Sequence, residues 1–298
     1  MSTVPMKPEI SSGSQARRPL TIARLAEMKI AGEPIVMVTA YDHPSACVAE
    51  AAGVDMILVG DSAAMVVLGH DSTVPITMDE MIMFASAVRR GATTPLIVGD
   101  MPFGSYEASN EVAIANAQRF IKEAGCDAVK LEGGGTSAER ARAIVEAGIP
   151  VVGHIGLTPQ TATSLGGFKA QGKTAEAARA VLADAQRLDQ AGCFAIVIEC
   201  VPAAVAELIS NQVAAITIGI GAGSRTSGQV LVYHDVLGLR DGSDAKFVRR
   251  YAELHRDSLT AISEYARDVR SGTYPGPEHV YAIEPGELSG LTEAIVNG

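Results

Sequence analysis

Five apolar segments of this sequence each end at an ionisable residue. They are MILVG before Asp61, LIVG before Asp100, AVKL before Glu132, VVG before His154 and AIVI before Glu199. An unpaired carboxylate buried after a strand costs several kcal/mol or takes up a proton, so each needs a partner. Because the arrangement recurs at successive strand ends, we expect these groups to share one site. With Lys130 nearby, they indicate a metal-assisted enzyme.

Asp61 and Asp100 are the best candidates for metal ligands. They follow two neighbouring strand-like segments in the contexts GDS and GDM. Two carboxylates suit Mg²⁺, which prefers oxygen ligands and takes the rest of its shell from water and substrate. Taken singly, either Asp could instead cap the loop that follows it.

Lys130 and Glu132 lie two residues apart on one predicted strand, so their side chains leave the same face. The functional interpretation places Lys130 against an anionic group of the substrate and Glu132 near the metal. An internal ion pair in a barrel is an alternative. Lys130 could also form a Schiff base if burial lowers its pKa.

His154 and Glu199 end two further segments of the same kind. A single His is commonly a hydrogen-bonded core residue, and His154 could be no more than that. Glu199 is remote in strand order from the two aspartates, which makes it a poor metal ligand. A carboxylate among apolar residues at that position suits a general base.

Strand-like segments alternate with helical patterns along most of the chain, which requires parallel strands joined by crossovers. The strands are expected at 35–40, 55–60, 95–99, 127–131, 150–153, 194–199, 214–219 and 229–233. The helices are expected at 44–52, 79–90, 110–124, 137–147, 175–191, 202–211 and 244–270. Eight strands, with acids at so many of their ends, predict a single-domain α/β fold, the (β/α)8 TIM barrel. An open doubly wound sheet is the rival.

The ends of the chain differ in character from the barrel. Residues 1–19 are rich in Ser and Pro and predict a flexible arm, followed by a short helix from Thr21 to Lys29. The catalytic barrel is expected at 20–270, and 271–298 form a tail that could pack on a neighbouring subunit. The long loops 61–78 and 156–174 lie at the predicted mouth, and the second has the length of a lid.

Composition excludes several other classes of protein. The net charge of −10 and the absence of a basic stripe argue against nucleic-acid binding. The four cysteines lack CxxC spacing, and no apolar run approaches the ~20 residues of a membrane helix. The N-terminus has no apolar signal region. We therefore expect a cytoplasmic protein in a reducing compartment, with no membrane partner.

Ten ordered motifs carry a resemblance to a known family. They are TAYDHPSA, ILVGDSAAMVVLGHDSTVPIT, AVRRGA, GDMPF, VKLEGG, GHIGLTPQ, GGFKAQGK, IECVP, IGIGAG and GQVLVYHD, between residues 39 and 235. Over about residues 20–281 the chain resembles the ketopantoate hydroxymethyltransferase family. The resemblance implies a barrel of the phosphoenolpyruvate/pyruvate type and a homodecamer of two pentameric rings.

The resemblance also implies a role for each matching residue. One Mg²⁺ per subunit is implied at Asp61, Asp100 and Glu132. The oxoacid substrate is implied to contact Asp61, Ser62, Asp100 and Lys130, with Ser62 and Lys130 holding its carboxylate. The Glu199 side chain matches the proton acceptor, and His154 matches a histidine that lines the site.

The implied reaction transfers a hydroxymethyl group from 5,10-methylenetetrahydrofolate to 3-methyl-2-oxobutanoate and gives 2-dehydropantoate, through an enolate stabilised by Mg²⁺. The main alternative is a metal-dependent C–C lyase acting on a 2-oxo or 2-hydroxy acid. A diacid substrate would need an additional Arg near the mouth, for which Arg225 is the candidate. A class I aldolase using Lys130 and an inactive ligand-binding barrel are further alternatives.

Overall fold

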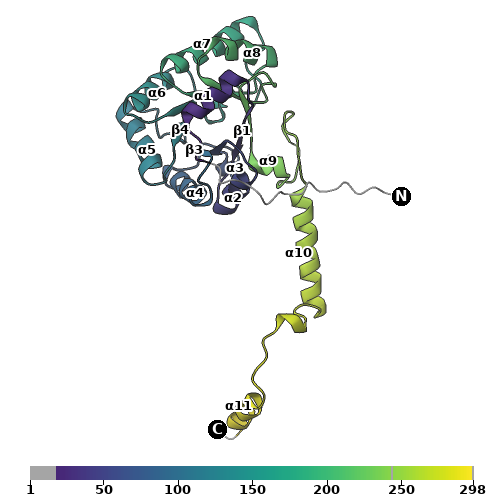
Figure 1. Cartoon of the computed structure of the whole chain (residues 1–298). Helices are drawn as coiled ribbons and strands as arrows, with labels where there is room; N and C mark the ends of the chain where they lie inside the picture. Colours follow the sequence, from purple (N-terminus) through teal and green to yellow (C-terminus); the bar gives the residue numbers. More distant parts are fainter. Residues whose placement is uncertain (1–17, 243, 297–298) are drawn as a thin grey trace, which may run out of the picture.

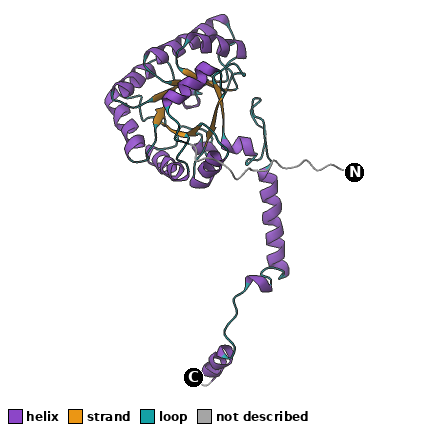
Figure 2. Ribbon diagram, in the orientation of Figure 1, coloured by secondary structure: helices purple, strands orange, loops and turns teal. Residues whose placement is uncertain are grey.

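Eight parallel strands close into a barrel with helices around it (Figures 1 and 2). The structure is a computed structural model and describes residues 18–242 and 244–296. Pairing of β1 with β8, in which Met37 lies opposite Val230, completes the ring. The strands are β1 Ile35–Thr39, β2 Met56–Val59, β3 Leu96–Asp100, β4 Ala128–Lys130, β5 Val151–Gly156, β6 Ala195–Glu199, β7 Ile216–Ile220 and β8 Gly228–Leu231. The predicted TIM barrel is confirmed, and the open sheet is excluded.

Alternation along the strands divides the core into an inner and an outer part. On β3, Val98 belongs to the cluster that fills the barrel, whereas Ile97 belongs to the cluster between strands and helices. The two faces carry successive residues because side chains alternate across a strand. Both faces of β2 and β3 are buried, which explains why the sequence of these strands is apolar without interruption.

Helices follow most of the strands and cover the barrel (Figure 1). Gly99 on β3 allows one of them, α5, to approach closely, since a Cβ there would lie 2.3 Å from the ring of Phe120. The helices around the barrel are α2 His43–Ala51, α3 Ala63–Val66, α4 Met78–Gly91, α5 Asn110–Lys122, α6 Ser137–Glu146, α7 Ala175–Gln190, α8 Ala203–Gln212 and α9 Tyr233–Leu237. Both long loops contain a short helix that was not predicted, α3 in the first and η1 (Pro159–Thr161) in the second.

The helix before the barrel, α1 (Ile22–Ala31), closes the end opposite to the mouth. Leu25 and Met28 pack into the interior cluster. Lys29 donates hydrogen bonds from Nζ to the carbonyl oxygens of residues 213, 214 and 215, at 2.7–3.0 Å. These contacts join α1 to the segment that leads into β7, so substrate has to enter from the other end.

The C-terminal part departs from the prediction. The helix expected at 244–270 is wrong over its first ten residues, because α10 begins only at Leu254 and runs to Ser271. The expected tail contains a further helix, α11 (Glu287–Val296). The predicted arm, 1–19, lies almost wholly outside the described residues, so the proposed domain boundaries stay predictions.

α10 stands away from the barrel (Figure 1), and none of its residues is buried. As a result, no helix covers the outer face of β1 and β8 among the described residues. Val36 is half exposed there, beside an apolar groove that Val48, Tyr233 and Val236 also line.

All four cysteines are free. Within the described ranges, no helix has the length and apolar character needed to cross a membrane.

Candidate active site

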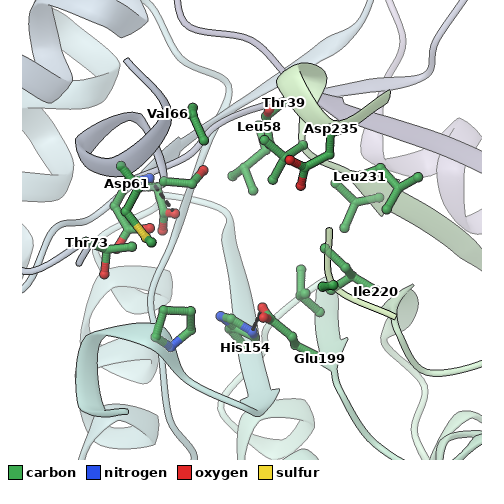
Figure 3. Close-up of a pocket in the computed structure, with 18 of the residues that line it drawn as sticks. Thr39, Leu58, Asp61, Val66, Thr73, His154, Glu199, Ile220, Leu231 and Asp235 are labelled. Atoms are coloured by element: carbon green, nitrogen blue, oxygen red, sulfur yellow. Dashed lines mark hydrogen bonds and ion pairs between the residues drawn. The ribbon is translucent and has the colours of Figure 1, made fainter. Parts of the chain in front are cut away.

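The predicted ionisable residues meet at the carboxyl ends of the strands. Asp61 follows β2, Asp100 ends β3, Glu132 follows β4, His154 lies in β5 and Glu199 ends β6. All five, together with Lys130 and Ser62, line one cavity (Figure 3). All but Ser62 and Glu199 are at most 4% exposed, and the Glu199 side chain is 16% exposed. The predicted convergence on one site is therefore confirmed.

Lys130 lies at the centre of the charges. Its Nζ is 2.8 Å from Oδ1 of Asp100 and 3.7 Å from Oε1 of Glu132. Burial lowers the pKa of Lys130, but the nearby carboxylates of Asp100, Glu132 and Asp61 outweigh burial and raise it above its ordinary value. The side chain is therefore an ammonium ion. A Schiff base needs a lysine with a lowered pKa, so the class I aldolase alternative loses its support.

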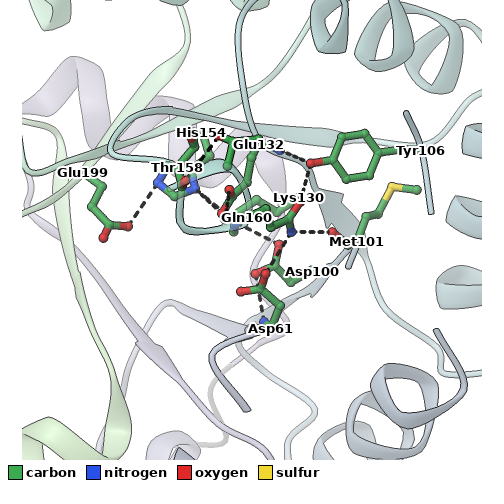
Figure 4. A network of polar contacts seen from close by, with 11 residues as sticks. Asp61, Asp100, Met101, Tyr106, Lys130, Glu132, His154, Thr158, Gln160 and Glu199 are labelled. Carbon is green, nitrogen blue, oxygen red and sulfur yellow. Dashed lines mark hydrogen bonds and ion pairs between the residues drawn. The ribbon is translucent and has the colours of Figure 1, made fainter. Parts of the chain in front are cut away.

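Asp61 and Asp100 lie side by side, as Figure 4 shows, and the backbone N–H of Asp61 donates to Oδ2 of Asp100 at 3.1 Å. Burial, with the negative charges of Asp100 and Glu132, raises the pKa of Asp61 well above its usual range. Burial and Glu132 likewise raise the pKa of Asp100, against the opposing effect of Lys130. The raised pKa values mean that the two ionised carboxylates lack a compensating positive charge. A bound cation would supply that charge in place of a proton.

The donor set fits a hard divalent cation. Oδ1 of Asp61 makes no hydrogen bond to any residue in the described ranges, and carboxylate oxygens are the ligands that Mg²⁺ prefers. The described residues contain no group of three His, Cys, Asp or Glu side chains that would enclose a metal by themselves. That is compatible with Mg²⁺, which is held in many enzymes by one or two carboxylates plus substrate and water.

Glu132 is occupied by hydrogen bonds at both oxygens. Oε1 lies 3.1 Å from Nδ1 of His154, and Oε2 accepts from the backbone N–H of Gln160 at 3.0 Å. Burial raises its pKa, but His154 and Lys130 outweigh burial and hold the pKa below its ordinary value. Glu132 is thus an ionised carboxylate, and its role as a metal ligand stays a prediction.

His154 bridges Glu132 and Glu199. Its Nδ1 faces Glu132, and its Nε2 lies 3.1 Å from Oε2 of Glu199. Burial and Lys130 lower the pKa of the imidazole, but Glu132 and Glu199 outweigh them and raise it to about 9. The ring is therefore doubly protonated at neutral pH, with Nδ1 at hydrogen-bond distance from Glu132 and Nε2 at ion-pair distance from Glu199. His154 is more than a core residue, because its positive charge lies between two carboxylates that line the cavity.

Two residues of this network, Gln160 and Tyr106, were missed by the sequence analysis (Figure 4). The amide Nε2 of Gln160 donates to Oδ2 of Asp61 at 2.9 Å and to the carbonyl of Met101 at 3.0 Å. Its Oε1 accepts from the hydroxyl of Tyr106 at 2.5 Å. Gln160 thereby joins the loop after β5 to Asp61 and Glu132. The only signal for Gln160 in the sequence was its position at the start of that loop.

Ser62 reaches the cavity at the start of α3, beside Asp61. Its Oγ lies 2.9 Å from the hydroxyl of Tyr41, which also accepts from Thr39 at 2.9 Å. The buried Tyr41 therefore positions Ser62, a link across 21 residues that no local pattern could have indicated.

Arg225, the arginine expected near the mouth for a diacid, does not line this cavity; its side chain is 74% exposed and lies 4.0 Å from Glu207. The expectation for Arg225 was therefore wrong. Arg240, after α9, does line the cavity, where it forms an ion pair with Asp235 at 2.8 Å.

Comparison with known proteins identifies close relatives. The family model described as ketopantoate hydroxymethyltransferase matches residues 19–277. A 3-methyl-2-oxobutanoate hydroxymethyltransferase of Heliobacterium modesticaldum is 53% identical over 91% of this chain and 98% of that protein. The mitochondrial 3-methyl-2-oxobutanoate hydroxymethyltransferase 1 of Oryza sativa subsp. japonica is 49% identical over 93% of this chain and 78% of that protein.

Solved structures with little sequence identity share the fold. A phosphoenolpyruvate phosphomutase from Streptomyces platensis subsp. rosaceus has a TM-score of 0.59 at 16% identity, covering 93% of this chain and 97% of that one. A phosphonopyruvate hydrolase in complex with oxalate and Mg²⁺ has a TM-score of 0.58 at 13% identity, with the same coverage of each chain. A 2,3-dimethylmalate lyase has a TM-score of 0.55 at 14% identity, covering 92% of this chain and 98% of that one.

Proposed function

Because this chain belongs to the ketopantoate hydroxymethyltransferase family, we propose that it transfers the hydroxymethyl group from 5,10-methylenetetrahydrofolate to 3-methyl-2-oxobutanoate. The family relation establishes that the chain is an enzyme, a hydroxymethyltransferase acting on 3-methyl-2-oxobutanoate. The name of the family points to pantothenate biosynthesis. The folate donor, the metal ion and the roles of individual residues are our proposal. Its main support is the convergence of the acids, Lys130 and His154 in one cavity.

The proposed metal is Mg²⁺, held by Asp61 and Asp100, with Glu132 nearby. Four carboxylates and two cations, Lys130 and His154, leave an excess of two negative charges when all are ionised, which a divalent cation balances. Bound there, Mg²⁺ would act as a Lewis acid that polarises the ketone of the substrate. The phosphonopyruvate hydrolase of the same fold, solved with oxalate and Mg²⁺, supports this choice of ion.

Lys130 and Ser62 are proposed to bind the carboxylate of the keto acid. Lys130 supplies a permanent positive charge, since its pKa is raised. The hydroxyl of Ser62, positioned by Tyr41, supplies a hydrogen bond. With the carboxylate held in this way, we propose that the C3 carbon faces Glu199, which lines the same cavity.

Glu199 is proposed to remove the proton from C3. It is the least buried acid of the cluster and is oriented by His154 at 3.1 Å. Water adds to the one-carbon unit and cleaves its two bonds to the folate nitrogens, which each take up a proton. The C3 carbanion then bonds to the released carbon, whose oxygen takes the proton held by Glu199 and becomes the hydroxyl. His154 acts here as a positioning residue, because it touches the base and not the reacting carbon.

The test of this assignment is deuterium exchange at C3 of 3-methyl-2-oxobutanoate, followed by NMR in the absence of folate. The wild type with Mg²⁺ is expected to catalyse exchange. The exchange rate of Glu199→Gln is expected to be lower by at least ~100-fold, the contribution typical of general base catalysis. Glu207→Gln on the exposed surface of α8 is the control and should exchange at the wild-type rate. Full exchange in Glu199→Gln would remove Glu199 as the base.

The lyase alternative now rests on Arg240 instead of Arg225, and on the likeness in fold to 2,3-dimethylmalate lyase. Arg240 is a poor receptor for a second substrate carboxylate, because Asp235 already balances its charge. Cleavage of 2,3-dimethylmalate, measured as release of a keto acid, separates the two reactions, and we expect none.

We also propose a homo-oligomer, as the family resemblance to a decamer implies. The support is the apolar stripe of α10, in which Leu259, Ile262 and Tyr265 are more than half exposed. The bare outer face of β1 and β8 is a second unpartnered apolar surface in the described part of the chain. A cytoplasmic location stays a prediction.

A further inference from the structure

The cavity extends beyond the acid cluster to a second wall, to which the proposed function gives no role. This wall is formed by the segment after β8, with Val232, Asp235, Arg240 and Phe247 among the residues that line the cavity. Figure 3 shows Asp235 across the cavity from Asp61. Figure 3 shows the carboxylate of Asp235 pointing into the cavity from this side. The proposed roles of the acid cluster leave this wall without a function.

This wall carries a hydrogen-bond acceptor, the carboxylate of Asp235, beside a donor, the guanidinium of Arg240. Oδ1 of Asp235 accepts from Nη2 of Arg240 at 2.8 Å, whereas its Oδ2 has no hydrogen-bond partner among the described residues. Nε of Arg240 is buried and also lacks a partner in the described ranges. A buried donor without a partner is unfavourable, so a group that binds here and accepts its hydrogen bond is the natural explanation.

Two aromatic side chains complete the wall. Phe247 packs beside the backbone of Gly221, where an added Cβ would lie 2.7 Å from the ring. Phe168, on the loop after β5, lines the same cavity and is 57% exposed. Phe247 is half-buried, and together the two rings offer flat apolar surface to a planar heterocycle.

We infer that this wall, the Asp235–Arg240 wall with Phe168 and Phe247, binds the pterin ring of the folate. The inference rests on the proposed function. The keto acid has no N–H group to give to Asp235. The amino-pyrimidinone edge of a pterin carries N–H donors next to a carbonyl oxygen, which match Oδ2 of Asp235 and the guanidinium of Arg240. The one-carbon unit on the pterin would then enter the cavity opposite Glu199.

The experiment compares binding of two probes to the Mg²⁺-loaded protein by calorimetry: tetrahydrofolate, and 6-methyltetrahydropterin, which lacks the benzoylglutamate. Asp235→Asn keeps the shape of the side chain and removes the charged acceptor. We expect this substitution to lower the affinity for both probes by roughly tenfold or more, the loss typical of a hydrogen bond to a charged group. The KM for methylenetetrahydrofolate should rise in parallel, while the KM for the keto acid changes little.

Asp241→Asn is the matched control, because Asp241 is exposed in the same segment and accepts a hydrogen bond from the N–H of the neighbouring Gly242. If Asp235→Asn does not fold, Phe168→Leu on the loop after β5 takes its place, with the same expected weakening of binding. Unchanged affinity for 6-methyltetrahydropterin would overturn the inference. Failure of C3 exchange in the wild type would instead contradict the proposed function, since the binding measurement does not depend on catalysis.

Discussion

At the scale of single residues, the site is organised by two cations among four acids. Lys130 pairs with Asp100, and His154 joins Glu132 to Glu199. Buried ion pairs of this kind contribute little net stability, because desolvation offsets their attraction. Their benefit lies in orientation. Each carboxylate oxygen that accepts a hydrogen bond is held in place, as both oxygens of Glu132 and Oδ2 of Asp61 are.

The pKa of His154, raised to about 9 from 6.5, predicts an alkaline limit to catalysis. Below that pH both ring nitrogens carry protons, whereas the neutral ring has one N–H and can hold only one of the two acids. C3 exchange should therefore decline as pH rises through about 9. The stability that this group contributes is complete below pH ~6.5 and is lost over the same rise, because its folded pKa lies above the unfolded value.

A pH–rate profile of the wild type and of His154→Gln checks this prediction. The variant is expected to exchange more slowly and to lose the alkaline limb, since its amide does not titrate. Persistence of the same limb in His154→Gln would assign it to another group.

At the scale of elements, the loop after β5 is coupled to the acids. η1 carries Gln160, which donates to Asp61 through its side chain and to Glu132 through its backbone. The predicted lid is therefore anchored at its start, and the carboxylate of Asp61 depends on a loop 99 residues away in sequence. Such hydrogen bonds to metal-binding carboxylates are worth ~10–100-fold in metal affinity or activity.

Gln160→Met keeps the length of the side chain and removes its polar groups. We expect Mg²⁺ affinity, measured by calorimetry, to fall by ~10–100-fold, and residues 162–174 to become more sensitive to limited proteolysis. Gln171→Met is the control, because its side-chain amide donates to the carbonyl of Lys169 on the same loop and, among the described residues, to no group of the acid cluster. Equal Mg²⁺ affinity in Gln160→Met and the wild type would show that the amide does not position Asp61.

At the scale of the whole molecule, α10 is the main unexplained surface. Its exposed apolar residues, Leu259, Ile262, Tyr265 and Val269, recur at helical spacing, and the helix lies away from the barrel that it follows (Figure 1). A stripe of this kind on an exposed helix indicates an interface. A second copy of the chain is the simplest partner for an enzyme proposed to be a homo-oligomer.

Ile262→Glu places a charge in the middle of this stripe. We expect the wild type to migrate as an oligomer in size-exclusion chromatography with light scattering, and the variant to dissociate. Thr260→Glu, on the opposite face of α10, should remain assembled. An Ile262→Glu protein with the mass of the wild-type oligomer would exclude this helix from the interface.

The sequence was sufficient for the barrel and for the convergence of these ionisable residues on one cavity. Uninterrupted apolar runs mark strands buried on both faces, and an acid after each run lies at the mouth whatever the details of packing. Asp61, Asp100, Lys130, Glu132, His154 and Glu199 could be named for this reason, since position at a strand end is a local property.

Only the tertiary structure decided which groups touch. The hydrogen bonds of Gln160, the support of Ser62 by Tyr41 and the wall of Asp235 and Arg240 join residues from different strand ends or loops, and strand curvature and loop conformation determine them. The position of α10 was equally beyond the sequence. Periodicity predicts which face of a helix is apolar, but the surface that covers this face depends on the path of the chain between Leu237 and Leu254.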